Sequence, residues 1–233
     1  MAGMAVTEQP LTIHLRDRSG RTRRLGAASA MPRGAVAALA VAPGAGAPID
    51  HPFLAGFARA MNEAGVATLR FNFAYLEEGR RSPDPPEVLM AAWRVAFEAA
   101  RERFPGLPVL AGGKSLGGRI ASMCVAEGLP AAGLVFLGYP LHPPGRPERL
   151  RDGHLYRIRV PMLFLQGTRD PFARPDLLAR VLARLGERAT HVPVEGGDHS
   201  FRVRGSGADD RAIGAALVAH AAPFVRRVAG AGR

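Results

Sequence analysis

Short apolar runs recur along the chain, and between them lie segments whose apolar residues return every three or four positions. A run of about four to eight mostly apolar residues bounded by Gly or Pro is typical of a strand covered on both faces of a sheet. The runs that fit are residues 35–42 (AVAALAVA), 66–73 (VATLRFNF), 108–112 (PVLAG), 133–138 (GLVFLG), 161–167 (PMLFLQG) and 190–194 (THVPV).

The segments between these runs predict helices. Phe53, Phe57 and Met61 recur at helical spacing, and further helices are predicted around residues 88–97, 116–127, 176–185 and 209–227. Buried strands that alternate with helices predict an α/β fold: a doubly wound, mostly parallel sheet with helices on both faces. We interpret residues 1–233 as a single domain, with residues 1–34 as antiparallel edge strands or a tail. The basic stretch 16–24, with a Ser-Gly turn signal at its centre, predicts an exposed hairpin tip.

Composition agrees with a globular protein and narrows its chemistry. Hydrophobic residues make up 47% of the chain and charged residues 22%, which is enough apolar content for a sizeable core. The single cysteine, Cys124, excludes an internal disulfide and a cysteine-based metal site within one chain. The net charge of +11 is the difference between 31 basic and 20 acidic residues, and Lys114 is the only lysine among the basic ones. Because the arginines are spread among abundant Ala, Gly and Pro and only 6% of residues are aromatic, we expect no nucleic-acid partner.

The beginning of the chain, MAGMAVTEQP, has no basic region followed by an apolar stretch. No uninterrupted apolar run reaches the roughly 18 residues that a membrane helix needs. We therefore expect a cytoplasmic protein with no membrane partner. The oligomeric state stays open, with a homodimer among the options.

The element Gly113-Lys114-Ser115-Leu116-Gly117 lies between a predicted strand and a predicted helix. A Gly-x-Ser-x-Gly element in this context is typical of a nucleophile elbow, in which two glycines let the backbone turn sharply and lift the serine hydroxyl clear of the sheet. The alternative is a glycine-rich turn in which Ser115 only caps the helix.

A serine hydroxyl needs a base, and the base needs a carboxylate that orients it. On this fold the required chain order is Ser, acid, His. Asp170 follows the strand 161–167, and His199 follows the strand 190–194. Asp170 could instead be a turn residue before a proline, and His199 a loop histidine without a role. The rival acids are Glu195 and Asp198.

An acyl-transfer site also needs backbone N–H donors for the oxyanion. We expect one donor to be the amide of Leu116, at the start of the helix, and the other to be the amide of Ala45, in the loop after the strand 35–42. Gly44 and Gly46 in that loop allow a substrate to approach closely. A phosphate-binding loop is excluded there, because no Gly-Lys-Ser/Thr follows at the required spacing.

Three polar residues are candidates for substrate binding: Lys114, beside Ser115, and Arg70 and Asn72, near the end of the strand 66–73. One hypothesis is that such cations hold an anionic substrate. The alternative is that Lys114 points away and pairs with a carboxylate. The excursion of about twenty residues after Gly138 is rich in proline, so we expect no large cap domain over the site.

Several motifs of the chain resemble those of the α/β-hydrolase superfamily. The similarity is closest to its small dienelactone-hydrolase-like branch, which includes the hydrolase-like domain shared by the testis-expressed protein 30 and subunit 3 of a nuclear histone-acetyltransferase regulatory complex. The motifs that carry it are PGAGAPIDHPF, LRFNF, GGKSLGGR, GYPLHPPGRPE, QGTRDPF and GGDHSF. The resemblance implies that Ser115, Asp170 and His199 occupy the nucleophile, acid and base positions.

Together these patterns predict a serine hydrolase that cleaves a small ester, thioester or related acyl compound. The expected partner is a small-molecule acyl substrate, and the chemistry needs no metal or organic cofactor. Because the nuclear members of the branch act within assemblies, the alternative is an interaction module on a hydrolase scaffold. A nucleic-acid binder is a third and weaker interpretation.

Overall fold

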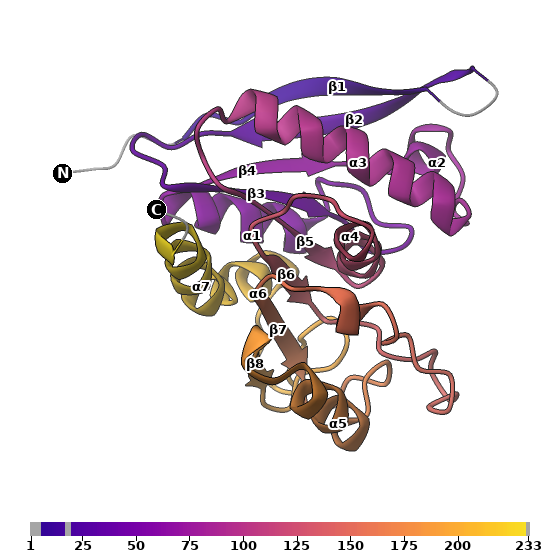
Figure 1. Cartoon of the computed structure of the whole chain (residues 1–233). Coiled ribbons are helices and arrows are strands. Elements are labelled where there is room, and N and C mark those ends of the chain that lie inside the picture. Colours follow the sequence, from indigo (N-terminus) through magenta and orange to yellow (C-terminus); the bar gives the residue numbers. More distant parts are fainter. Residues whose placement is uncertain (1–5, 17–19, 232–233) are drawn as a thin grey trace.

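The computed structural model describes residues 6–16 and 20–231 and contains one eight-stranded sheet of order β1-β2-β4-β3-β5-β6-β7-β8 (Figure 1). The strands from β3 to β8 run parallel to one another, whereas β2 pairs antiparallel with both of its neighbours, β1 and β4. The strands are β1 (Gln9–Arg16), β2 (Thr22–Ala30), β3 (Ala37–Ala42), β4 (Val66–Phe71), β5 (Val109–Lys114), β6 (Leu134–Leu137), β7 (Met162–Gly167) and β8 (Ala189–Val194). The doubly wound, mostly parallel sheet that the sequence predicts is thereby confirmed.

Helices cover both faces of the sheet (Figure 1). One face packs against α3 (Pro86–Arg103), α4 (Leu116–Ala126) and α5 (Pro175–Leu185), and the other against α1 (Pro52–Glu63), α6 (Asp210–Ala216) and α7 (Val218–Ala231). Alternate residues of a strand enter opposite cores: in β3, Ala38 and Ala40 face the α3 side, and Leu39 and Val41 the α1 side. Burial on both faces explains the continuous apolar runs in the sequence.

The structure differs from the sequence prediction at several segments. The predicted helix 209–227 divides at Leu217 into α6 and α7. A short helix, α2 (Ala74–Glu77), lies in the segment interpreted as a loop. The strands β1 and β2 form the expected antiparallel edge, and residues 17–19 of the predicted hairpin tip lie outside the described residues.

One segment, Asp210–Ala231, is long and apolar enough by composition to cross a membrane, since its most apolar 18-residue window has a mean hydropathy of 1.2. However, 56% of this window is buried in the protein, and α6 and α7 supply part of the core on the α1 face. Its apolar residues are therefore accounted for by packing against the sheet.

The connection between β6 and β7 carries a single turn of 3-10 helix, η1 (Leu155–Arg157), and a second such turn, η2 (Gly186–Arg188), precedes β8. No cap helix is therefore built over the carboxyl ends of the central strands in this described segment.

Candidate active site

Ser115 occupies a strained turn between β5 and α4. Its backbone angles are φ 47° and ψ −110°, a conformation that costs free energy for a residue with a side chain. The flanking glycines are required by space, since a Cβ at Gly113 or at Gly117 would lie 2.3 Å from the carbonyl oxygen of Ala42. The backbone N–H of Ser115 donates to the Leu137 carbonyl of β6 at 3.1 Å. The turn at Ser115 therefore packs between the carboxyl ends of β3 and β6.

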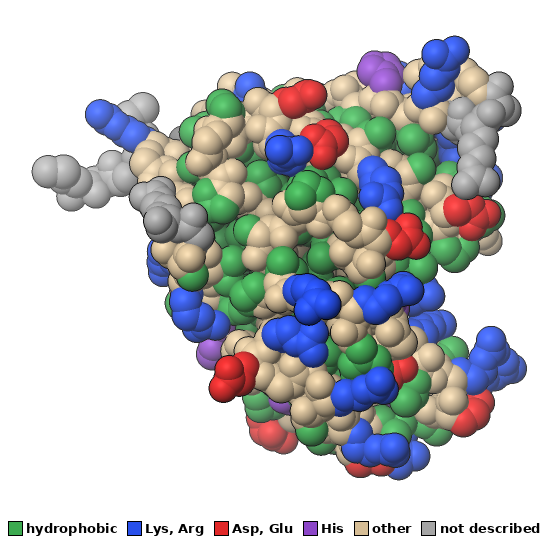
Figure 2. Space-filling view, viewed as in Figure 1, with side chains coloured by type: hydrophobic (Ala, Val, Ile, Leu, Met, Phe, Trp, Pro, Cys, Tyr) green, Lys and Arg blue, Asp and Glu red, His purple; other side chains and the backbone are tan. Residues whose placement is uncertain are grey.

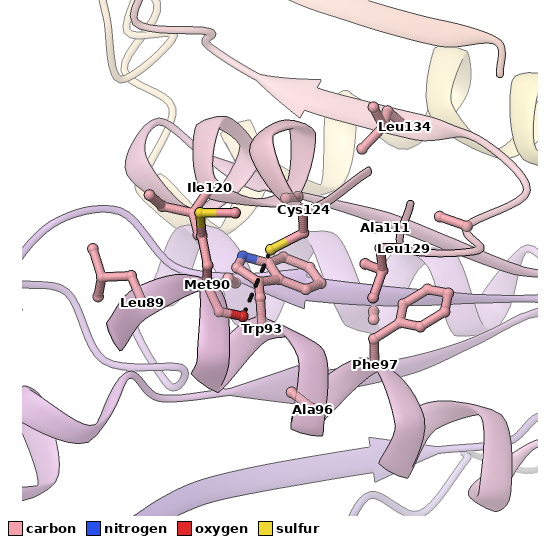
Figure 3. Packing of buried hydrophobic residues seen from close by; sticks show 14 of the residues in the cluster. Leu89, Met90, Trp93, Ala96, Phe97, Ala111, Ile120, Cys124, Leu129 and Leu134 are labelled. Atoms are coloured by element: carbon pink, nitrogen blue, oxygen red, sulfur yellow. Dashed lines mark hydrogen bonds between the residues drawn. The ribbon is translucent and has the colours of Figure 1, made fainter. Parts of the chain in front are cut away.

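The helix that follows Ser115 is fixed by a buried cluster between α3 and α4 (Figure 3). Trp93 of α3 is fully buried, and its indole N–H donates to the Gly117 carbonyl at 3.0 Å. The Cys124 thiol of α4 contacts the Met90 carbonyl at 3.6 Å, and burial raises the pKa of this thiol to about 12. Cys124 is therefore a packing residue, and the cluster holds the first turn of α4 in place.

Two hydrogen bonds join three residues that are far apart in the sequence. His199 Nε2 lies 2.8 Å from Ser115 Oγ, and His199 Nδ1 lies 2.7 Å from Asp170 Oδ2. Each residue follows the carboxyl end of a different parallel strand: β5, β7 and β8. With the ring proton on Nδ1, the Nε2 lone pair faces the serine hydroxyl, which is the arrangement that general-base catalysis requires.

Asp170 is the carboxylate that is hydrogen-bonded to the His199 ring. Its side chain is fully buried. Besides the histidine it accepts hydrogen bonds from Gln166 Nε2 at 2.6 Å and from the Phe172 backbone N–H at 2.8 Å. The Phe172 ring also stacks on the His199 ring, with centroids 4.1 Å apart.

The rival acids have other partners. Asp198 accepts the backbone N–H groups of Ser200 and Arg202, and Glu195 accepts the Thr168 hydroxyl. Neither carboxylate bonds the histidine ring, so the geometry selects Asp170.

The loop after β3 presents two backbone amides beside Ser115. The Gly46 N–H donates to the Tyr75 hydroxyl at 2.9 Å, and the Ala47 N–H donates to the Gly44 carbonyl at 3.2 Å. Among the described residues, the amides of Gly44 and Ala45 have no recorded acceptor. The Cβ of Ser115 lies 3.8 Å from the position that a Cβ would take at Gly44. The expected donor, Ala45, is therefore available, whereas the Gly46 amide is already bonded.

A cavity of about 340 Å³ opens beside Ser115 and His199. One part of its wall is apolar and the other is a charged rim, where Arg202 pairs with Asp210 at 2.8 Å. The lining residues other than Ser115 and His199 are Gly44, Ala45, Ala47, His51, Phe53, Lys114, Phe172, Ser200, Arg202 and Asp210. A larger and more open groove of about 630 Å³ lies between β1 and α3, but none of Ser115, Asp170 or His199 lines it.

Two residues predicted to bind substrate lie elsewhere. Arg70 is only 4% exposed, and its guanidinium bonds the Glu8 carboxylate and the Ile49 carbonyl. Asn72 accepts the Ile49 N–H at 2.8 Å. Neither side chain lines the cavity, because both are occupied in fastening the loop after β3 to the end of β4. The structure therefore corrects their expected placement.

Lys114 fits neither of the two expectations for it, which were binding of an anionic substrate and pairing with a carboxylate. It lines the cavity, but its ammonium donates to the backbone carbonyl of His199 at 2.6 Å, so it neither points into the cavity nor pairs with a carboxylate.

A second serine–histidine pair lies away from this cavity. Ser122 Oγ is 2.8 Å from His154 Nε2, and Ser122 is fully buried. Burial and the nearby arginines Arg119 and Arg157 lower the pKa of His154 to about 4. Since no carboxylate hydrogen bond to this histidine is recorded among the described residues, the pair has the character of a packing contact. Among those residues there is also no cluster of three or more His, Cys, Asp or Glu that could hold a metal ion.

Sequence reasoning missed three residues that shape the site. Gln166 was detectable in principle, because it is the one polar residue in the apolar strand MLFLQG. Phe172, in a loop after β7, and Tyr75, in the short helix α2, gave no such signal, since aromatic residues close to strand ends are common in any core.

Comparison with known proteins agrees with this fold. Residues 35–226 match a family model described as an alpha/beta hydrolase domain. The whole chain is similar to a dienelactone hydrolase from Anabaena variabilis, with a TM-score of 0.73 and 20% identity over 95% of this chain and 97% of that one. A carboxyl esterase from Bacillus coagulans gives 0.71 and 14% identity over 96% and 99% of the two chains. A serine hydrolase without lid from Xanthomonas campestris gives 0.68 and 20% over 93% and 95%. At these identities the solved structures bear on the fold alone.

Proposed function

The chain belongs to the α/β-hydrolase family, and from this premise we propose that it is a serine hydrolase of small acyl compounds. The observation that carries the proposal is the pair of hydrogen bonds from Ser115 Oγ through His199 to Asp170, at 2.8 and 2.7 Å. These bonds face a cavity that could hold an ester or thioester.

In the proposed reaction, Ser115 Oγ attacks the acyl carbon while its proton passes to His199 Nε2. The negative charge that develops on the carbonyl oxygen is stabilised by the amides of Leu116 and Ala45. The tetrahedral intermediate then expels the leaving group, which takes the proton from Nε2, and an acyl-serine remains. A water molecule then attacks the acyl carbon while His199 Nε2 takes one of its protons. The bond between the acyl carbon and Ser115 Oγ breaks, Nε2 passes the proton to Oγ, and the carboxylic acid leaves.

Cavity size and the missing cap support small substrates. The cavity of about 340 Å³ is near the lower end of the range for small-molecule sites, and the β6–β7 connection builds no cap helix above it. The similar proteins named as a dienelactone hydrolase and as a lidless serine hydrolase are consistent with such substrates.

The test is hydrolysis of a short-chain nitrophenyl ester by Ser115→Ala, with Ser122→Ala as the matched control. Both serines have a histidine nitrogen at 2.8 Å, but only Ser115 lines the cavity. Ser115→Ala should lose on the order of 10⁴ or more in kcat, while Ser122→Ala should keep its rate per folded molecule. Equal activity of Ser115→Ala and wild type would overturn the proposal and favour a non-catalytic interaction module on a hydrolase scaffold.

A further inference from the structure

Lys114 connects three segments that meet at the candidate site. Its stem passes under the loop after β3, since Cγ lies 3.5 Å from where a Cβ would be at Gly44. Its ammonium lies 3.3 Å from the corresponding point at Gly138, directly after β6. Its hydrogen bond ends at the His199 carbonyl, in the loop after β8. Lys114, which is next to Ser115 in the sequence, therefore also contacts the backbone of His199.

Space for the ammonium is provided by Gly138. This residue has φ +74°, and a side chain there would lie 3.3 Å from the Lys114 ammonium and 3.4 Å from the His199 carbonyl oxygen. A glycine at the end of β6 thus leaves room for the contact between lysine and histidine backbone.

The segment that carries His199 has a strained backbone next to the histidine. Phe201, two residues later, has φ 62°, a strained value for a residue with a side chain. Its ring stacks on Phe53 of α1, with centroids 5.8 Å apart, and lies 5.6 Å from the Lys114 ammonium. A charge-assisted bond to the carbonyl of His199 is among the stronger hydrogen bonds available to hold such a segment.

We propose that Lys114 is a positioning residue: its ammonium holds the His199 backbone so that the imidazole stays in line with Ser115 Oγ. This inference rests on the proposed serine-hydrolase function. A displacement of the imidazole by about 1 Å can cost about 100-fold in rate, so a single backbone bond is sufficient to matter.

Burial of the Lys114 ammonium lowers its pKa, so its charge can be followed by titration. Desolvation lowers the pKa of Lys114 to about 8, although the carboxylates of Asp170 and Asp198 partly oppose the shift. The His199 carbonyl oxygen that accepts the hydrogen bond from the ammonium does not titrate itself. Because the folded-state pKa lies below the usual value, the ammonium is present below about pH 8 and is lost as the pH rises through that value. The positioning bond should weaken over the same interval.

The kinetic experiment compares Lys114→Met and Lys114→Arg with wild type across pH 6 to 10. We expect Lys114→Met to lower kcat about 10- to 100-fold with little change in KM, because the base is misplaced while the cavity is kept. Wild type should lose kcat above about pH 8, Lys114→Met should lack that alkaline limb, and Lys114→Arg should move it beyond the measured range, since arginine stays charged. Arg59→Met, which removes an exposed cation of α1, is the control and should match wild type.

Lys114 is the only lysine in the sequence, so lysine labelled with carbon-13 gives one side-chain NMR signal that needs no assignment. Its titration midpoint should lie near pH 8 and coincide with the kinetic limb. A purely structural lysine would lower the melting temperature on substitution without changing the pH profile of kcat. Rates are therefore expressed per folded molecule, and the alkaline limb of kcat is the readout that separates the two roles.

The outcomes separate the two proposals. Wild type that hydrolyses no ester overturns the proposed function. Active wild type whose kcat and alkaline limb survive in Lys114→Met overturns only the positioning role, as does a lysine signal that titrates near the usual value of about 10.4.

Discussion

At the scale of single residues, the carboxylate of Asp170 is used on both oxygens. Oδ2 accepts from His199 Nδ1 and from Gln166 Nε2, while Oδ1 accepts the backbone N–H of Phe172. A carboxylate can do this because it is an acceptor at every lone pair. An amide cannot, since one of its ends is a donor.

Asp170→Asn should therefore keep the fold and lose most of the activity. The amide oxygen must stay toward the Phe172 N–H, so the amide NH₂ would face His199 and favour the wrong ring tautomer; in a comparable triad this costs about 10⁴ in kcat. Asp198→Asn is the matched control and should cost less than about tenfold, because asparagine supports the same turn. Steady-state kinetics of both variants checks this, and a larger loss for Asp198→Asn would contradict the assignment of the acid.

The residues found from the sequence are those whose chemistry is tied to a strand end. Ser115, Asp170 and His199 each follow a buried strand, and parallel strands bring their carboxyl ends together. Arg70 also lies near a strand end, but the side chain turns to Glu8 and to the carbonyl of Ile49. The sequence could not show this, because both partners come from distant segments.

At the scale of elements, α1 and α6 pack closely through glycine. A Cβ at Gly214 of α6 would lie 2.0 Å from the Phe53 carbonyl, and one at Gly56 of α1 would lie 2.3 Å from the Arg211 carbonyl. These helices also bring Phe53 and Asp210 to the cavity. Helix spacing was not readable from the sequence pattern, which predicted one continuous helix across residues 209–227.

Gly214→Ala should destabilise the protein by about 1–3 kcal/mol, because the added methyl group overlaps the α1 backbone. That loss corresponds to a fall in melting temperature of roughly 2–4 °C per kcal/mol for a chain of this size.

Gly230→Ala is the matched control, since nothing lies within 4 Å of a Cβ at this helical position of α7. It should be neutral or stabilise by up to about 1 kcal/mol. Equal melting temperatures for the two variants would show that α1 and α6 can move apart without lowering the free energy of unfolding.

At the scale of the whole molecule, arginine is distributed over the surface among apolar and acidic side chains. The face in Figure 2 shows Lys and Arg more densely over its lower half, with acidic groups interspersed. Several arginines are paired, as in the bond of Arg23 to Asp84 at 2.9 Å and of Arg94 to Glu127 at 3.1 Å. Part of the arginine charge is therefore neutralised locally, as at the cavity, where Asp210 offsets Arg202.

The open site predicts a preference for short acyl chains. Each methylene gains about 0.8 kcal/mol only where a wall can bury it. In the described part of the chain, the β6–β7 connection places no cap helix over the cavity of about 340 Å³. Across nitrophenyl esters from about two to twelve carbons, kcat/KM should therefore peak at about two to four carbons, without activation by detergent micelles. A rate that climbs through ten carbons would mean that an apolar channel forms on substrate binding.

An activated Ser115 nucleophile should react with a fluorophosphonate probe, which forms a covalent adduct with such serines. Wild-type protein should gain the mass of one adduct, and peptide mapping by mass spectrometry should place it on Ser115, with no adduct in Ser115→Ala and an adduct retained in Ser122→Ala. Unlabelled wild type, or an adduct on another serine, would show that Ser115 is not the nucleophile.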